Sequence, residues 1–182
     1  MRLYEGTSKQ FIQDTIQNDI ADKLESSFEQ YYGRRVNPRE KNSWINSLQF
    51  LKNAIDQNRL YDSMVVLENE LPYSNERLDC LLFGRSNNNK ESAVIIELKQ
   101  WSNVEDSEID DNIITYVGGA NRMEAHPSFQ VRGYHYHLMD FIKCFDEENP
   151  IDLHSCAYCH NYSHDENSVL FFEKFSPILN EF

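Results

Sequence analysis

Apolar positions in the first third of the chain recur at helical spacing. Over residues 8–32 they return every three or four positions, which predicts one amphipathic helix ending at Tyr32-Gly33. A second helix is predicted from Asn37-Pro38 to about residue 57, with asparagine as the cap and proline in the first turn. Glu40, three residues after the cap, fits a capping box better than a ligand role.

The texture changes after about residue 62. Short runs rich in β-branched and aromatic residues, separated by turn-forming segments, predict strands. A further helix is expected over Pro127–Phe141. The predicted strands are Met64–Leu67, Leu78–Phe83, Ala93–Lys99, Ile113–Val117 and Leu153–Tyr158. This order predicts an α/β fold in which helices flank a central mixed β-sheet.

Length and composition fit one domain over residues 1–182, with a helical part at about 8–57 and a sheet core at about 62–182. A content of 40% hydrophobic residues is enough for a packed core. No apolar run approaches the roughly 20 residues that span a bilayer, and the N-terminus lacks the pattern of a signal peptide. We therefore expect a cytoplasmic protein without membrane contact.

The predicted strand Ala93–Lys99 carries the first sign of chemistry. Alternate residues of a strand share a face, so Glu97 and Lys99 follow the apolar Ile95 on one face. Burying these charges costs free energy unless they are paired or bind an ion. A simple ion pair at an exposed strand end is the alternative interpretation.

One aspartate, Asp79, heads the preceding apolar strand. A hairpin closed by the polar loop 84–92 brings Asp79 beside Glu97. Adjacent carboxylates repel each other, and a shared divalent cation relieves that repulsion; Mg²⁺ suits such oxygen ligands. Lys99 could then orient an attacking water or stabilise charge developing on phosphorus.

Asp79 followed by Glu97-Leu98-Lys99 resembles the D…(D/E)xK signature of the restriction-endonuclease-like superfamily of nucleases. A second element strengthens the resemblance. Gln130 and Tyr134 lie four residues apart on one helix face and resemble the QxxxY motif of the RecB-like branch. The resemblance implies a restriction-endonuclease-like fold and metal-dependent hydrolysis of nucleic acid, DNA in preference to RNA. A structural glutamine in an apolar helix stripe is the alternative for Gln130.

Residues 5–180 together resemble the nuclease-like region that lies N-terminal to a Schlafen group 3-like DNA/RNA helicase domain in bacterial proteins. The matching segments are Glu40–Leu48, Glu70–Pro72, Arg77–Asp79, Glu97–Trp101, His126–Tyr134 and Cys156–Tyr162. No Walker A pattern occurs, so a helicase or ATPase module is expected as a partner in cis or in trans. The resemblance also implies a role in defence against phage or foreign DNA.

The nuclease hypothesis predicts a metal site with few protein ligands. We expect Asp79 and Glu97 to bind one or two Mg²⁺ or Mn²⁺ ions, with the backbone carbonyl of Leu98 as a further candidate ligand and Glu70 as a candidate third carboxylate. Lys99 assists the nucleophilic water.

Four other side chains are assigned to the substrate. Gln130 and Tyr134 are expected to act in catalysis by positioning the substrate strand or the metal-site residues. Arg77 and Arg132 are candidate contacts to phosphate groups.

Net charge opposes nucleic-acid binding by this chain alone. The 17 basic and 30 acidic residues give −13, whereas phosphate contacts require clustered lysine and arginine. Bound divalent ions would reverse the local field, and a basic partner could deliver the substrate. The acidic stretch Glu105–Asp111 is expected to be a solvated loop.

The cysteines and the nuclease motif each allow another function. Cys156 and Cys159 with His160 match a zinc pair or a c-type haem attachment pattern, but haem attachment needs export and a second zinc ligand pair is missing. No structural zinc is expected. The main rival is a catalytically silent adaptor that keeps the fold and docks onto an ATPase or nucleic acid; the complete D…ExK…QxxxY set argues against it.

Overall fold

Five strands form the central sheet, in the order β1-β2-β3-β4-β8. The computed structural model describes residues 1–163, 165 and 167–182. Neighbouring strands are antiparallel except for β4 and β8, which are parallel. The strands of this sheet are β1 (Tyr4–Thr7), β2 (Met64–Glu70), β3 (Arg77–Arg85), β4 (Glu91–Lys99) and β8 (Asp152–Cys159).

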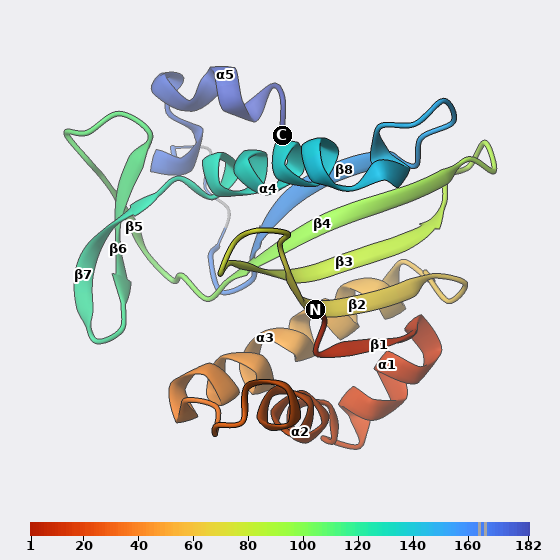
Figure 1. Ribbon diagram of the computed structural model, residues 1–182. Coiled ribbons are helices and arrows are strands. Elements are labelled where there is room, and N and C mark those ends of the chain that lie inside the picture. Colours follow the sequence, from red (N-terminus) through yellow and green to blue (C-terminus); the bar gives the residue numbers. More distant parts are fainter. Residues whose placement is uncertain (164, 166) are drawn as a thin grey trace.

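Helices cover both faces of this sheet (Figure 1). The N-terminal helices α1 (Ser8–Ile16), α2 (Ile20–Tyr32) and α3 (Pro38–Gln57) lie on one face. On the other face lie α4 (Pro127–Phe141) and the short α5 (Ser176–Leu179). The mixed α/β architecture with flanking helices is therefore confirmed. No helix among the described residues is long and apolar enough to cross a membrane.

The start of α3 and both ends of α4 lie where the sequence predicted them. The side chain of Asn37 accepts a hydrogen bond of 2.9 Å from the backbone N–H of Arg39, as an N-cap should. The capping-box interpretation of Glu40 is wrong, because its carboxylate contacts the Arg77 guanidinium of β3 instead. α3 is thereby tied to the sheet as well as packed on it.

The prediction of one helix over residues 8–32 is also wrong. α1 ends at Ile16 and α2 begins at Ile20, with Asn18 between them in the left-handed region at φ 63°. Asparagine tolerates this conformation better than most residues, and a single such residue redirects the chain without interrupting the apolar spacing. Buried Asp14 supports the bend between α1 and α2. Its carboxylate accepts a hydrogen bond of 3.0 Å from the Tyr4 hydroxyl and forms an ion pair of 2.6 Å with Lys23 of α2.

A second, three-stranded sheet is inserted between β4 and α4 and projects to the left in Figure 1. It consists of β5 (Val104–Asp106), β6 (Asn112–Val117) and β7 (Ala120–Ala125), all antiparallel. The predicted strand Ile113–Val117 exists, but it belongs to this sheet rather than to the central one. The expected loop Glu105–Asp111 begins inside β5, where Asp106 pairs with Lys174 at 2.6 Å.

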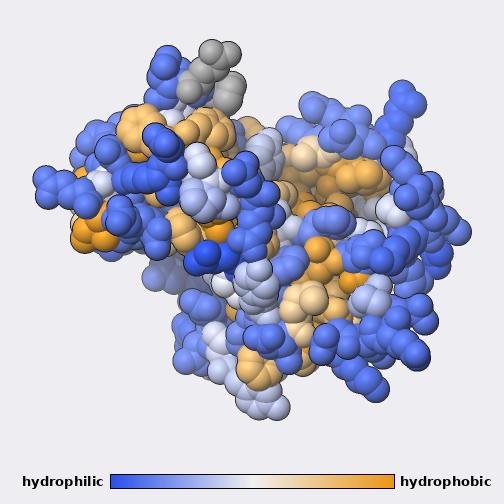
Figure 2. All heavy atoms as spheres, turned by 90° about the horizontal axis from the view of Figure 1, so that it is seen from above, coloured by the Kyte–Doolittle hydropathy of each residue, from blue (hydrophilic) through white to orange (hydrophobic). Residues whose placement is uncertain are grey.

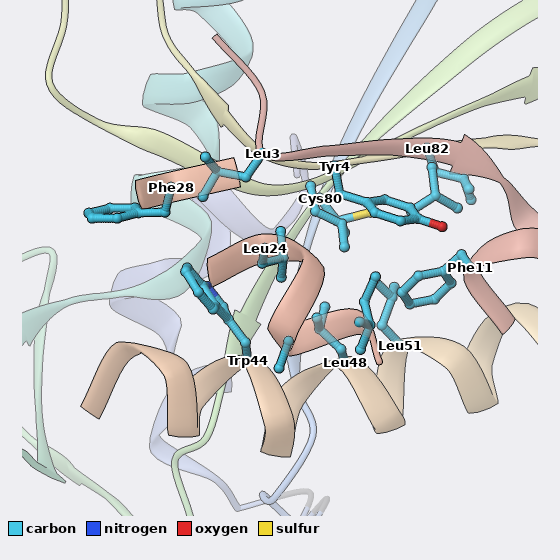
Figure 3. Close-up of a cluster of buried hydrophobic side chains, with 14 of the residues drawn as sticks. Leu3, Tyr4, Phe11, Leu24, Phe28, Trp44, Leu48, Leu51, Cys80 and Leu82 are labelled. Atoms are coloured by element: carbon cyan, nitrogen blue, oxygen red, sulfur yellow. The ribbon is translucent and has the colours of Figure 1, made fainter. Parts of the chain in front are cut away.

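The described residues also include three helical turns of 3-10 type: η1 (Lys143–Phe145), η2 (Val169–Phe171) and η3 (Glu173–Phe175). Apolar side chains fill both interfaces between sheet and helices. Figure 3 shows the larger cluster, in which Phe11 and Leu24 are fully buried between the N-terminal helices and the sheet. On the other face Ile95 and Val131 are fully buried between β4 and α4. Removing a large buried side chain of this kind costs about 2–5 kcal/mol, so the strand ends beside these clusters are held firmly.

Candidate active site

Asp79 and Glu97 lie side by side at the end of the β3–β4 hairpin. The last register pair of these strands is Cys80 with Ile96, so Asp79 and Glu97 are the next residues on each strand. The carboxylate of Asp79 accepts a hydrogen bond of 2.7 Å from the backbone N–H of Leu98. This bond fixes the aspartate against β4 and leaves the Leu98 carbonyl as a candidate ligand.

Glu97 is 4% exposed, and its two carboxylate oxygens differ in their hydrogen bonding. Oε1 accepts from the Lys99 ammonium at 2.8 Å and from the Gln130 side-chain N–H at 2.8 Å. Oε2 is buried and has no hydrogen-bond partner among the described residues. An unpaired buried carboxylate oxygen costs free energy, which a cation or a water could recover.

α4 completes the network from the opposite side. Its Gln130 accepts from Lys99 at 2.7 Å through the amide oxygen, and the amide nitrogen donates to the Tyr134 hydroxyl at 2.7 Å as well as to Glu97. Gln130 thus bridges strand and helix, using both N–H bonds and the oxygen. Its partners Glu97, Lys99 and Tyr134 are the residues that the sequence singled out.

Burial and like charge shift the pKa values at this site. Burial raises the pKa of Asp79 well above its ordinary value, and the neighbouring Glu97 carboxylate adds to this effect. Burial also raises the pKa of Tyr134, with a further contribution from Glu97, so the phenol remains protonated at neutral pH. A buried aspartate whose ionisation is opposed by a neighbouring carboxylate is an arrangement that a divalent cation stabilises.

Glu68 of β2 is a further acidic residue here, and it is not among the site residues predicted from the sequence. It is 8% exposed, and it lies between the register pairs Leu67–Cys80 and Asn69–Leu78, in the position facing Asp79. Its backbone φ is 51°, in the left-handed region that glutamate rarely adopts. The hairpin register offered a signal, because it places Glu68 rather than Glu70 opposite Asp79.

Two polar contacts hold the carboxylate of Glu68. It accepts a hydrogen bond from the Trp44 indole at 2.8 Å and lies 3.3 Å from Arg77. Burial raises the pKa of Glu68 to about 7, against the opposing effect of Arg77. Arg77 also contacts Glu40, while its Nη1 is buried without a hydrogen-bond partner among the described residues. The arginine is therefore engaged by carboxylates and has one N–H group to spare.

Glu70 and Arg132 lie outside the network. The Glu70 carboxylate is 3.6 Å from the N-terminal ammonium of Met1, so it is engaged elsewhere. Arg132 stacks over the ring of Phe129 at 4.7 Å, on the same helix as Gln130 but without a hydrogen bond to it. Neither residue contacts Asp79 or Glu97 in the structure.

A pocket of about 380 Å³ opens on the α3 side of the strand ends. Asp79, Glu68 and Arg77 line it together with α3 residues that include Ser43 and Ser47. Asp79 thus borders this pocket and also lies next to Glu97, which belongs to the hydrogen-bonded network with α4. A ligand in the pocket would have access to the Asp79 carboxylate.

Two of the cysteines border these residues, because Cys80 directly follows Asp79 and Cys159 pairs in register with Lys99. All four are free, and burial raises the pKa of Cys159 to about 11. His160 instead hydrogen-bonds to Ser47 of α3 at 3.1 Å and stacks on Phe50. The histidine of the Cys-x-x-Cys-His segment therefore joins β8 to α3, next to the pocket.

The donor set suits a hard divalent cation, although it is not a complete cage. No three His, Cys, Asp or Glu side chains in the described part of the chain converge on one point as ready metal ligands. Mg²⁺ does not require them, because it commonly binds one or two carboxylates and keeps water or phosphate as its other ligands. The free Oε2 of Glu97 and the adjacent Asp79 meet that requirement.

Comparison of the chain with known protein families, curated proteins and solved structures finds no match. What the site can do is therefore inferred from its own side chains. A buried carboxylate with one free oxygen stands beside a second carboxylate, a lysine ammonium and an amide. Such a set can bind a hard cation and orient a water molecule or a phosphate oxygen.

Proposed function

We propose that this protein is a metal-dependent nuclease with a restriction-endonuclease-like fold. The observation that carries the proposal is the hydrogen-bonded set of Glu97, Lys99, Gln130 and Tyr134 beside Asp79. Residues from two distant segments of the sequence meet there. The resemblance to D…(D/E)xK and QxxxY nucleases pairs the same side chains.

The chain's own residues have distinct tasks in this proposal. Asp79 and the free oxygen of Glu97 hold Mg²⁺ or Mn²⁺, with the Leu98 carbonyl as a further ligand. Lys99, held by Glu97 and Gln130, directs its ammonium at the attacking water and at the charge that develops on the phosphate. When bound, the cation acts as a Lewis acid on the phosphoryl oxygens and lowers the pKa of water.

Gln130 and Tyr134 position Lys99 and Glu97 rather than react. The Gln130 amide fixes the ammonium relative to the carboxylate, and the Tyr134 hydroxyl fixes the amide. Small displacements of reacting groups are expensive in rate, so such supports matter. The neutral phenol keeps a hydrogen-bonding hydroxyl in the site at physiological pH.

The substrate that we propose is DNA, delivered by another module. A chain of net charge −13 has little long-range attraction for a polyanion. A helicase or ATPase in cis or in trans would raise the effective concentration of nucleic acid at the site. Arg77 is a candidate phosphate contact, because its Nη1 amino group has no hydrogen-bond partner among the described residues and the residue lines the pocket beside Asp79. A role in defence against foreign DNA follows from the resemblance to helicase-linked nucleases.

The rival is a silent adaptor with the same fold. Its difficulty is the buried Glu97, because a carboxylate with an unpaired oxygen destabilises a domain that gains nothing from it. A docking module would be more stable with an apolar residue at this position. In the nuclease proposal this destabilising oxygen is needed, because it is a ligand of the metal ion.

The test is cleavage of end-labelled single- and double-stranded DNA by the purified protein with Mg²⁺, with Mn²⁺ and with a chelator. We expect cleavage only with the metals. Asp79→Ala, Glu97→Ala and Lys99→Ala should each abolish cleavage. Glu91→Ala is the matched control, because Glu91 lies on β4 as well but pairs with Arg85 in solvent.

Cleavage by Asp79→Ala or Glu97→Ala at the wild-type rate would reject the proposed site. If the wild type cleaves no DNA or RNA substrate with either metal, the adaptor function replaces the nuclease. Circular dichroism and thermal melting of each variant separate loss of chemistry from loss of fold.

A further inference from the structure

One edge of the three-stranded sheet is open. β7 pairs with β6 on one side, and among the described residues no strand pairs with its other side. Five of its six residues are exposed. Figure 1 shows β7 at the outer limit of the molecule, with no helix or loop covering it. An uncovered edge strand presents unpaired peptide groups to any second strand.

The turn before β7 determines which peptide groups face outward. Gly118 and Gly119 form a two-residue turn with φ of 63° and 93°, the conformation that favours glycine at both positions. In such a hairpin the pair that flanks the turn is hydrogen-bonded, and hydrogen-bonded pairs then alternate along the strands. The peptide groups of Arg122 and Glu124 therefore point to β6. Those of Met123 point outward.

The charges on this strand complement a second copy of the same strand. If two β7 strands run antiparallel with Met123 opposite Met123, Arg122 of each stands opposite Glu124 of the other. Met123 then occupies a hydrogen-bonded position. The two Arg–Glu pairs occupy non-hydrogen-bonded positions, where facing side chains lie closest. Both charge pairs and outward peptide groups thus favour the same register.

Apolar surface supports the same arrangement. Met123 is 50% exposed and Tyr116 of β6 is 61% exposed, so both side chains leave apolar surface open to solvent. Met123 lies opposite Ile114 of β6, so the two form a short apolar row that starts next to Glu105 of β5 and ends at the open edge. In Figure 2 the end of the molecule formed by this sheet, at the left, shows apolar patches among hydrophilic residues. A second copy would continue the row across the junction.

We propose that β7 is a dimerisation strand, which pairs antiparallel with β7 of a second copy of this chain to form one continuous six-stranded sheet. The occupant is a second copy because the strand is complementary to itself about Met123. A basic partner would be repelled by Arg122, and an acidic one by Glu124. The pairing does not depend on the proposed nuclease activity.

The size of the contact indicates a weak, reversible dimer. A single pair of six-residue strands buries less than the roughly 1,200 Å² of a stable interface. We therefore expect a monomer–dimer equilibrium rather than a permanent dimer. Sedimentation velocity of the full chain, from about 5 µM to about 500 µM in roughly 0.15 M salt, covers the relevant range.

Charge exchange gives the decisive test. Arg122→Glu and Glu124→Arg should each weaken dimerisation at least tenfold, because each places like charges opposite one another. An equimolar mixture of these two variants should dimerise at the wild-type level, since both cross-strand pairs are restored. Arg35→Glu, at an exposed site in the segment between α2 and α3, should leave dimerisation unchanged.

Thermal melting would show that each variant is folded, and the mixture controls for damage to either one. A wild type that is monomeric over the whole range overturns the proposal. So does a dimer that persists in both single variants, or a mixture that stays monomeric while the wild type dimerises.

Discussion

Lys99 donates a hydrogen bond of 2.7 Å to the side-chain oxygen of Gln130, although the two residues are 31 positions apart in the sequence. The three-stranded sheet lies between them in the chain, so this bond closes the base of the whole insertion. It also sets the direction of the ammonium group, because Lys99 contacts Glu97 at the same time. Removing the amide should therefore affect chemistry more than stability.

Gln130→Ala and Tyr134→Phe should lower the cleavage rate by at least about tenfold while leaving the fold intact. The Tyr134 change removes one hydroxyl that accepts from Gln130, which costs about 1 kcal/mol of stability. Cleavage kinetics at saturating metal and urea unfolding measure the two effects. Tyr31→Phe is the control, because Tyr31 is exposed on α2. Normal cleavage combined with early melting would make both residues structural.

Binding of DNA by the isolated chain should be weak and metal-dependent. At net charge −13 we expect dissociation constants no tighter than about the micromolar range of non-specific binding. Divalent metal should tighten binding, since it neutralises Asp79 and Glu97. Fluorescence anisotropy with Lys99→Ala protein, with and without Mg²⁺, separates binding from cleavage. Nanomolar binding without metal would contradict this expectation, and would show that the chain has a basic surface despite its net charge of −13.

Glu68 should make the folded state less stable as pH rises. Its pKa is about 7 in the folded protein against an ordinary 4.5, so between these values the folded state holds a proton that the unfolded chain has released. Raising the pH through this window removes on the order of 3 kcal/mol of stability through Glu68 alone. Asp79, whose pKa is also raised, acts in the same direction.

Glu68→Gln should therefore flatten the dependence of the unfolding free energy on pH between about 4.5 and 7. Urea titrations at several pH values measure it. Glu70→Gln serves as control, because Glu70 lies on the same strand but pairs with the terminal ammonium. An unchanged slope in Glu68→Gln would show that this carboxyl ionises freely in the folded state.

Cys159 should not hold zinc. Burial keeps its thiol protonated, with a pKa of about 11, and zinc binds the thiolate. We expect no stoichiometric zinc in protein purified without added metal, by elemental analysis. Cys159→Leu should change stability by less than about 1.5 kcal/mol, since the residue packs among apolar side chains. One zinc per chain that disappears with this substitution would contradict the expectation.

The fold was predictable where the signal was local. Asn37 and Pro38 mark the start of α3, and both bounds of α4 follow from its sequence. The break at Asn18 was not predictable, because one left-handed residue leaves the apolar period on either side intact. The assignment of β6 to a separate sheet was not predictable either, since the strand pattern of Ile113–Val117 does not specify its partner.

The candidate site shows the same division. Asp79, Glu97 and Gln130 could be selected because residue type and period coincide with a motif. Glu68 matched no motif and was not selected, although it faces Asp79 in the β2–β3 pairing; its φ of 51° departs from the backbone of a regular strand. Glu70 was a candidate metal ligand because it closes the first predicted strand. The structure shows its carboxylate beside the Met1 ammonium instead.

The parallel pairing of β4 with β8 has a consequence during synthesis on the ribosome. β4 receives its neighbour β3 from the preceding hairpin, but its other neighbour begins only at Asp152. Until that segment emerges, one edge of the apolar run Val94–Ile96 is open to other nascent chains. Pairing between such distant segments is also slow to form. We therefore expect chains that stop before β8 to aggregate, and the yield of full-length protein to rise at lower expression temperature or with added chaperones.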